Sequence, residues 1–310
     1  MSALICGSFA YDTIMVFHDH FKNHILPEQV HILNVSFLVP DMRREFGGCA
    51  GNIAYNLNLL GGEGKPMGTV GTDFKPYADW MDSCGISREH IREVEGQYTA
   101  QAYITTDQDD NQITAFHPGA MNFAHENVVS DAKDCTIGLV SPDGRDGMIQ
   151  HAEQFADAGI PFMFDPGQGM PMFDGDDLLR FAEQAQWLAF NDYEAKLMQE
   201  RTGKSPEQLA QMVDAVVVTR GGEGSSIYTQ SKVYEIPVAK AAGLEDPTGC
   251  GDAYRSGLLY GLMNGMDWEV TGRIAALMGA IKIEHAGTQN HSFTRDEFDQ
   301  RFKDVFGMSL

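Results

Sequence analysis

The stretch Asp246-Pro247-Thr248-Gly249-Cys250-Gly251-Asp252 indicates the fold, because it lies where a loop becomes a helix. The segment 253–263 that follows has apolar side chains at helical spacing. Gly249 and Gly251 carry no Cβ, so the N–H groups of the loop can turn towards one point and a ligand can approach the backbone. The positive end of the helix dipole lies behind them, and the stretch therefore predicts an anion-binding site.

Asp252 needs its own explanation, because a carboxylate at an anion site repels the ligand that the site attracts. A proton acceptor explains it. Asp252 would take a proton from a substrate hydroxyl while the N–H groups bind the charge on a transferred phosphoryl group. The alternative is an ordinary N-cap aspartate after a glycine-rich loop.

The second half of the chain alternates short apolar runs with helical patterns, which is typical of βαβ units. We expect an α/β fold with a doubly wound, mostly parallel sheet, formed by one domain of residues 1–310. The predicted strands lie at 3–6, 67–70, 136–140, 160–164, 187–190 and 215–219, with a hairpin at 225–229 and 233–236. The predicted helices lie at 76–84, 146–158, 175–185, 192–202, 205–213, 273–285 and 295–306.

Two segments, at about 13–45 and 97–117, do not fit this alternation. The first contains β-like stretches, at 30–35 and 36–39, and the second has the pattern of a hairpin. We expect them to form a small β lid, because a closing lid keeps water from competing as phosphoryl acceptor.

A second glycine-rich loop, Gly47-Gly48, also runs into an amphipathic helix, where Asn52 offers both a donor and an acceptor. Asp12 follows the first predicted strand, and ligands of open α/β sheets bind beyond the carboxyl ends of the strands. Asp12 is therefore a candidate to accept hydrogen bonds from substrate hydroxyls. A plain glycine turn and a turn-capping aspartate are the alternatives.

Later strand ends carry further candidates. Asn191 and Glu194 place an amide and a carboxylate on one face of a starting helix, where they predict either a Mg²⁺ site or a capping box. The turn 219–224 follows another strand, and it predicts either a nucleotide contact through Thr219 or the turn of a hairpin.

Composition excludes several classes of partner. The net charge of −22 argues against nucleic acid and anionic membrane, and it requires a phosphate site to draw on local N–H groups and a metal. No apolar run approaches the length of a membrane span. The five cysteines show no C-x-x-C spacing, and the N-terminus lacks a signal-peptide pattern, so we expect free thiols in a cytoplasmic protein. The oligomeric state stays open between monomer and homodimer.

Residues 246–252 resemble the D-x-x-G-x-G-D signature of the ribokinase-like (PfkB-type) carbohydrate and nucleoside kinases. The resemblance covers essentially the whole chain and implies a ribokinase-like fold with a small β lid. Further motifs are similar in the family's order: Asp12, Gly47-Gly48 with Asn52, Asn191-x-x-Glu194 and Thr219-x-Gly221-x-x-Gly224.

The same resemblance implies roles for these residues. Asp252 would be the catalytic base, and Asp246 matches the position of a monovalent cation, which raises K⁺ as a further ion. Glu194 would organise Mg²⁺. The anion hole would be formed by the N–H groups of Gly249, Cys250 and Gly251; ribose or sugar would be held by Asp12, Gly47, Gly48 and Asn52; and ATP would be contacted by Asn191, Thr219, Arg220, Gly221 and Gly224.

Within the family, segments 46–55 and 115–121 are most similar to bacterial adenosine or broad nucleoside kinases. Cys49 stands where the common sugar-kinase loop has a basic residue, and Pro247 replaces the usual Thr or Ser. The resemblance therefore implies ATP-dependent phosphorylation of a nucleoside 5′-hydroxyl, with adenosine converted to AMP. Candidates to contact the base are two stacking residues, Phe116 and Phe164, and two amides, Gln101 and Gln168.

Three alternatives stay open. A sugar kinase of the same family would act on ribose, fructose or a related polyol. An inactive relative that senses a nucleotide or nucleoside would gain nothing from the carboxylate at Asp252. A dinucleotide-binding dehydrogenase is disfavoured, because no G-x-G-x-x-G follows the first predicted strand.

Overall fold

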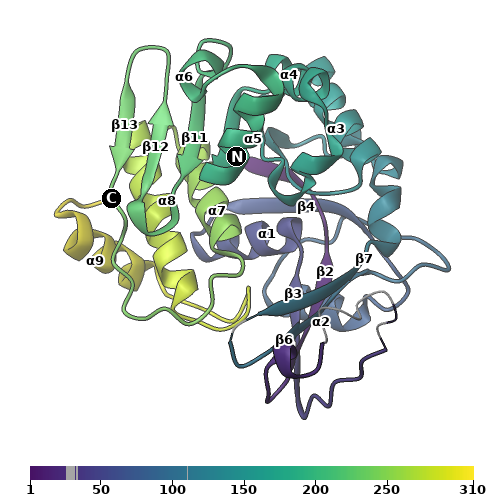
Figure 1. Cartoon of the computed structure of the whole chain (residues 1–310). Coiled ribbons are helices and arrows are strands. Elements are labelled where there is room, and N and C mark those ends of the chain that lie inside the picture. The colour runs from purple at the N-terminus through teal and green to yellow at the C-terminus, as the bar shows by residue number, and fades with distance from the viewer. Residues whose placement is uncertain (26–31, 33, 110) are drawn as a thin grey trace.

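The largest element is a mostly parallel sheet, which Figure 1 shows at the centre of the molecule. The computed structural model describes residues 1–25, 32, 34–109 and 111–310. Within this part of the chain the strand order is β13-β12-β11-β10-β9-β8-β1-β4-β5, and only β12 and β13 run antiparallel to their neighbours. The strands are β1 (Ser2–Cys6), β4 (Glu63–Val70), β5 (His90–Glu93), β8 (Cys135–Val140), β9 (Phe162–Phe164), β10 (Trp187–Asn191), β11 (Ala215–Thr219), β12 (Ser225–Tyr228) and β13 (Val233–Ile236).

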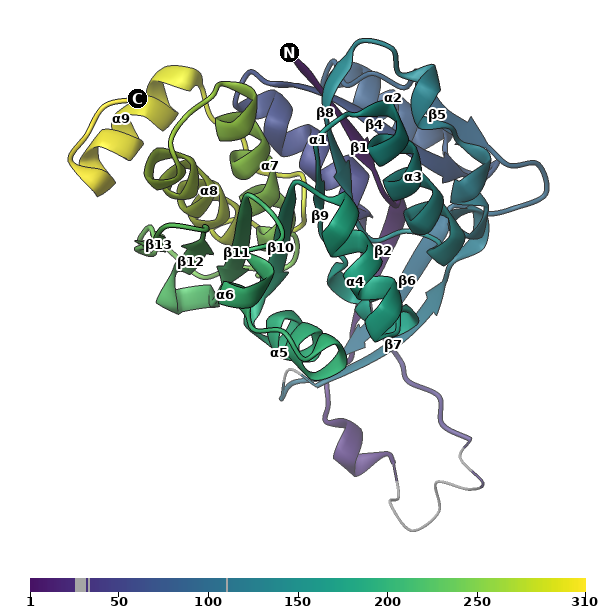
Figure 2. The same ribbon diagram turned by 90° about the horizontal axis from the view of Figure 1, so that it is seen from above.

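Helices cover both faces of this sheet, as Figure 2 shows, and each face has its own apolar core. The central strands are buried on both sides, which explains why they are apolar without alternation. One face carries α1 (Cys49–Leu59), α2 (Lys75–Ser83), α7 (Cys250–Met263), α8 (Trp268–Ile283) and α9 (Arg295–Phe306). The other carries α3 (Arg145–Ala158), α4 (Gly175–Gln184), α5 (Asp192–Thr202) and α6 (Pro206–Leu209). The predicted doubly wound α/β fold is confirmed.

A second, four-stranded sheet has the order β3-β2-β6-β7. It consists of β2 (Ala10–Val16), β3 (Asp41–Gly47), β6 (Ala100–Thr106) and β7 (Gln112–His117). The hairpin predicted in the second lid segment corresponds to β6 and β7, which pair antiparallel.

The strands predicted at 30–35 and 36–39 need correction. Residues 34–40, which the structure describes, form no strand, and residues 30, 31 and 33 lie outside the described part. The two edges of β2 are taken by β3 and β6, so no ladder position on β2 remains for residues 36–39. Phe37 instead packs against Phe17 and Phe21, with ring centroids 4.9 and 5.0 Å apart.

Other boundaries also differ from the prediction, among them the starts of β4 at Glu63 and of β9 at Phe162. α8 begins at Trp268 rather than at residue 273, because Asp267 caps it by accepting a hydrogen bond from the Val270 N–H at 2.9 Å. α6 is shorter than the predicted 205–213. Among the described helices, none combines the length and the apolar composition needed to span a bilayer.

Candidate active site

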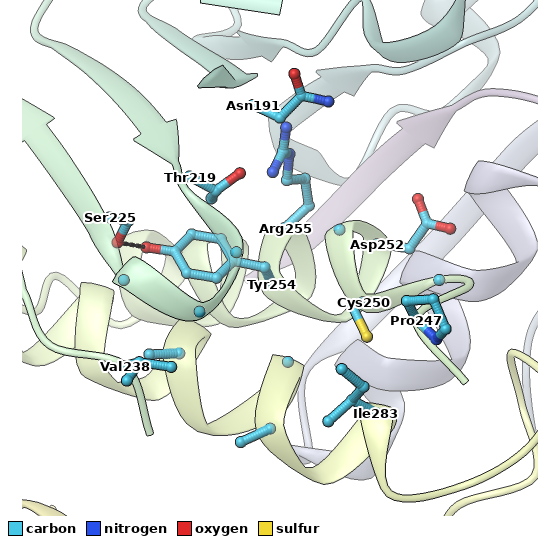
Figure 3. A pocket seen from close by; sticks show the side chains of 18 of the residues that line it. Asn191, Thr219, Ser225, Val238, Pro247, Cys250, Asp252, Tyr254, Arg255 and Ile283 are labelled. Atoms are coloured by element: carbon cyan, nitrogen blue, oxygen red, sulfur yellow. Dashed lines mark hydrogen bonds between the residues drawn. The ribbon is translucent and has the colours of Figure 1, made fainter. Parts of the chain in front are cut away.

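A cavity of about 590 Å³ runs from the carboxyl ends of β10 and β11 to the start of α7. Figure 3 shows Asp252 and Arg255 projecting from α7 to the same side, while Tyr254 reaches across to Ser225. The predicted residues that line the cavity are Gln168, Asn191, Glu194, Thr219, Gly221, Gly224, Gly249, Cys250, Gly251 and Asp252. The tertiary structure therefore gathers these residues from four separate segments around one space.

The start of α7 is built around Gly249, which is its N-cap with φ 79°, a left-handed conformation that favours glycine. Among the described residues no side chain caps this helix, so its first N–H groups are left for another partner. The Cys250 N–H is an exception, because it donates to the Pro247 carbonyl oxygen at 3.2 Å. Of the three amides predicted to bind an anion, that of Cys250 is thus engaged within the loop.

Asp252 lies in the first turn of α7, half-buried, with its side chain at the cavity. Because Gly249 is the N-cap, the alternative of a capping aspartate does not apply. The Asn52 amide donates to Oδ2 of Asp252 at 2.8 Å. Burial raises the pKa of Asp252 to about 6, against the lowering effect of the Asn52 hydrogen bond. A base whose pKa lies near the working pH is suited to accept a proton from a hydroxyl.

The amide of Asn52 is held from both ends. Its Oδ1 accepts from Gln289 Nε2 at 2.9 Å, and Gln289 Oε1 in turn accepts from Trp80 Nε1 at 2.9 Å. Asn52 is 4% exposed. In this structure it orients Asp252, a contact that differs from its predicted role as a ligand of sugar hydroxyls.

Arg255 is the functional candidate that the sequence analysis missed. Its guanidinium lines the cavity and forms a buried ion pair with Asp165, with Nε–Oδ2 3.0 Å and Nη2–Oδ1 3.2 Å. It lies three residues after Asp252, so both side chains share one face of α7. A charged residue inside an otherwise apolar helix was the available signal. Asp165 also lines the cavity and balances the charge of Arg255, so the pair holds the guanidinium donors in a fixed orientation there.

Asp12, Gly47 and Gly48 meet where the small sheet joins α1. A Cβ built on Gly47 would lie 2.5 Å from Asp12 Oδ2, so the two residues are in contact. Asp12 faces Glu45 across the β2–β3 pair. Burial, followed by the charges of Glu45 and Asp246, raises the pKa of Asp12 to about 6.

Of the four residues predicted to contact a nucleoside base, one lines the described cavity. Phe164 is wholly buried and stacks on Phe181 at 4.0 Å, so its assignment as a stacking residue needs correction. Phe116 is 53% exposed on β7 and is absent from the described lining of the cavity. Gln101 donates to Asp73 at 3.0 Å and accepts from a tyrosine hydroxyl, which occupies its amide. Gln168 does line the cavity.

Asn191 and Glu194 form the capping box, one of the two alternatives for this pair. Both carboxylate oxygens of Glu194 accept hydrogen bonds from Asn191 at 2.8 Å. Burial raises the pKa of Glu194, followed by the charge of Asp165. The carboxylate still lines the cavity, and its remaining lone pairs suit a hard cation such as Mg²⁺ or its bound water.

The turn after β11 brings Thr219, Gly221 and Gly224 to the cavity. The assignment of Arg220 as an ATP contact needs correction for its side chain. The Arg220 guanidinium is hydrogen-bonded to Ser226 and to Glu235, the latter at 3.0 Å. Since Ser226 and Glu235 lie on the antiparallel strands β12 and β13, the Arg220 side chain braces this edge of the sheet instead of facing a nucleotide.

Asp246, the predicted cation ligand, is 8% exposed. Its carboxylate accepts from the Thr248 and Gly287 N–H groups, each at 2.9 Å. Burial alone would raise the pKa of Asp246, but these hydrogen bonds outweigh it and lower the pKa. Asp246 is therefore a charged residue that holds the ends of two loops together.

Comparison with known proteins agrees with this arrangement. Residues 10–295 match the pfkB family of carbohydrate kinases. The structure of Burkholderia thailandensis nucleoside kinase in complex with inosine superposes with a TM-score of 0.91 at 54% identity, covering 99% of both chains. The same protein in complex with ADP-inosine gives 0.88 at 56% identity, over 99% of this chain and 97% of that one. The nucleoside kinase of Methanocaldococcus jannaschii is 31% identical over 272 residues, 87% of this chain and 89% of its own.

The family match spans most of the chain, and the site contains the carboxylate, glycine loop and cavity that phosphoryl transfer to a hydroxyl requires. The chain therefore belongs to the pfkB family of carbohydrate kinases and is a phosphotransferase with an alcohol group as acceptor.

Proposed function

We propose that this chain transfers the γ-phosphoryl group of ATP to the 5′-hydroxyl of a purine nucleoside, with adenosine converted to AMP as the specific reaction. The observation that carries the proposal is the half-buried carboxylate of Asp252 at the uncapped start of α7, facing the cavity. Support for the substrate class comes from relatives that are nucleoside kinases, one of them described with inosine and with ADP-inosine.

Asp252 acts as the general base in this proposal. Its carboxylate takes the proton of the attacking hydroxyl, and the Asn52 amide keeps one carboxylate oxygen in place. The N–H groups at the start of α7 other than that of Cys250, together with the Arg255 guanidinium, stabilise the negative charge that develops on the phosphoryl oxygens. Positioning and charge stabilisation supply most of the rate in phosphoryl transfer, and both come here from a rigid helix.

The two substrates approach Asp252 from different sides. The cavity along β10, β11 and α8 accommodates the nucleotide, with Thr219, Gly221 and Gly224 near its phosphates or ribose. Asp12 accepts hydrogen bonds from the ribose hydroxyls of the acceptor, and the four-stranded sheet closes over it as a lid. Mg²⁺, held through Glu194 or its bound water, would neutralise phosphate charge when present. Burial and the capping box keep that carboxylate in one orientation.

A substrate panel tests the proposal. ADP release is measured with ATP and Mg²⁺ against adenosine, inosine, guanosine, ribose and fructose. We expect saturable turnover on purine nucleosides, with adenosine among them. Turnover on ribose or fructose with none on any nucleoside would contradict the nucleoside assignment and favour a sugar kinase. Turnover on inosine with none on adenosine would contradict adenosine as the substrate but would still support a nucleoside kinase.

A further inference from the structure

Lys282, near the end of α8, has no exposed surface. Its ammonium donates to the carbonyl oxygen of Asp246 at 2.7 Å and to that of His285 at 3.0 Å. Burying an ammonium is costly unless fixed partners replace its water, and here two carbonyl oxygens do so. Lys282 is not among the residues that line the cavity, and it takes no part in the proposed proton transfer.

The carbonyls that Lys282 binds belong to a junction between two parts of the site. The Glu245 and Asp246 N–H groups donate to the Ile283 carbonyl oxygen at 2.8 and 3.2 Å, which ties the loop before α7 to the end of α8. The Gly287 N–H donates to Asp246 Oδ2. The C-terminus of a helix carries partial negative charge, so a cation is favoured at this point.

The charges around the Lys282 ammonium determine whether a second cation can bind beside it. Burial lowers the pKa of Lys282, and the carboxylate of Asp246 counteracts this effect. Arg43 adds a second positive charge, with Nη2 3.7 Å from Asp246 Oδ2. A free cation at the carbonyl of Asp246 would compete with the ammonium for the same oxygen and would be repelled by it. The K⁺ that the family resemblance raises therefore does not fit the described residues.

We propose that Lys282 is a built-in cation that holds residues 246–251 in the conformation needed for phosphoryl transfer, in place of a monovalent ion from solution. Lys282 is a positioning residue, since it acts through the loop and contacts no substrate. The inference rests on the proposed function only in that the loop binds the transferred phosphoryl group. Because the cation is built in, turnover does not depend on K⁺.

The first experiment uses the unmodified protein. Turnover on adenosine or inosine is measured in KCl and in N-methylglucamine chloride at equal ionic strength. Equal rates in the two salts are expected. Activation by K⁺ of several-fold would overturn the proposal, because a built-in cation leaves nothing for K⁺ to supply.

The second experiment removes the ammonium. Lys282→Ala leaves room for an ion among the carbonyl oxygens, whereas Lys282→Met fills the space with an apolar chain. We expect both variants to lose about 100-fold in turnover in N-methylglucamine chloride, as a displaced catalytic loop would cause. K⁺ or NH₄⁺ should restore turnover and raise the Tm of Lys282→Ala but not of Lys282→Met. Lys303→Ala, which removes an exposed lysine on α9, is the matched control.

Normal turnover of Lys282→Ala without a small cation would contradict the positioning role. If neither variant folds, the salt comparison on the unmodified protein still decides. The Tm response of Lys282→Ala needs no substrate. A K⁺-dependent rise in its Tm, with no turnover of the unmodified protein on any nucleoside, would reject the proposed function while keeping the inference.

Discussion

The two glycine-rich helix starts of this molecule have the same local form and different surroundings. Gly48 is the N-cap of α1 with φ 88°, and Gly249 is the N-cap of α7 with φ 79°. At α1 the first amides are taken within the protein, because the Ala50 N–H donates to the Ser8 carbonyl oxygen at 3.0 Å and the Cys49 N–H to Ser8 Oγ at 3.3 Å. The α7 start lines the cavity, and Gly251 there is exposed.

This difference shows that a glycine-rich helix start is not by itself an anion site. The start of α1 is a structural joint that holds β2, α1 and the Gly48 loop together, and its glycine is required by close packing. The start of α7 has free space in front of it and a buried cation, Arg255, one turn behind it. Cys49 at the start of α1 also lines the cavity, but its N–H and that of Ala50 donate to Ser8, so the engagement of the first amides and the nearby charge distinguish the two sites.

The largest expected effect is on the α7 side. Asp252→Asn keeps the size of the side chain but removes the base, so kcat should fall by about 10²–10⁴-fold. Single-turnover kinetics and the Tm are measured together. Asp296→Asn, which changes an exposed first-turn aspartate of α9, is the control and should keep full turnover. Full turnover of Asp252→Asn would reject the assignment of the base.

A pair of glycine substitutions separates the two helix starts. Gly48→Ala should lower the Tm sharply, because its φ costs roughly 1–3 kcal/mol for a residue with a Cβ. The new Cβ would also lie 2.5 Å from the Ser8 carbonyl oxygen. Gly251→Ala has open space around its Cβ, so its Tm should not fall. Its methyl group would obstruct the anion site, and turnover should drop by roughly tenfold, less than loss of a whole donor costs.

The comparison fails if the two glycine variants behave alike. A stable Gly48→Ala with weakened nucleoside binding would make the start of α1 a ligand site as well. Thermal unfolding and turnover are the two measurements, and each should respond in only one of the two variants.

The smallest expected effect is a shift in pH dependence. As the pH falls through about 6, Asp252 gains a proton and loses its capacity as a base, so kcat/KM should decline below that pH. Asn52→Ala removes a hydrogen bond that lowers the pKa of Asp252, and the inflection should therefore move to higher pH. The pKa of Asp12 is also raised to about 6, so Asp12→Asn is the control. An inflection that disappears in Asp12→Asn and stays in place in Asn52→Ala would assign it to Asp12 instead.

The position of each glycine turn at a helix start was predictable from sequence, because a glycine turn before an apolar helix is a local pattern, but whether the turn faces the cavity was not. The cavity contains Gly221, Gly224, Gly249 and Gly251. Side-chain assignments were less secure. Phe164 is a core residue and the Arg220 guanidinium faces the edge of the sheet. A side chain's direction depends on neighbours that the local sequence does not reveal.

The sequence by itself determined the fold class and the family, because apolar periodicity and the order of the glycine and aspartate motifs are local properties of the chain. Only the tertiary structure decided which side chains act together. Asn52 donates a hydrogen bond to Asp252, which is 200 residues away in the sequence, and Arg255 pairs with Asp165, which is 90 residues away. Lys282 donates to the carbonyl oxygen of Asp246. Hydrogen bonds and ion pairs form wherever folding brings a donor and an acceptor together, so such partners are not encoded in any one stretch of the sequence.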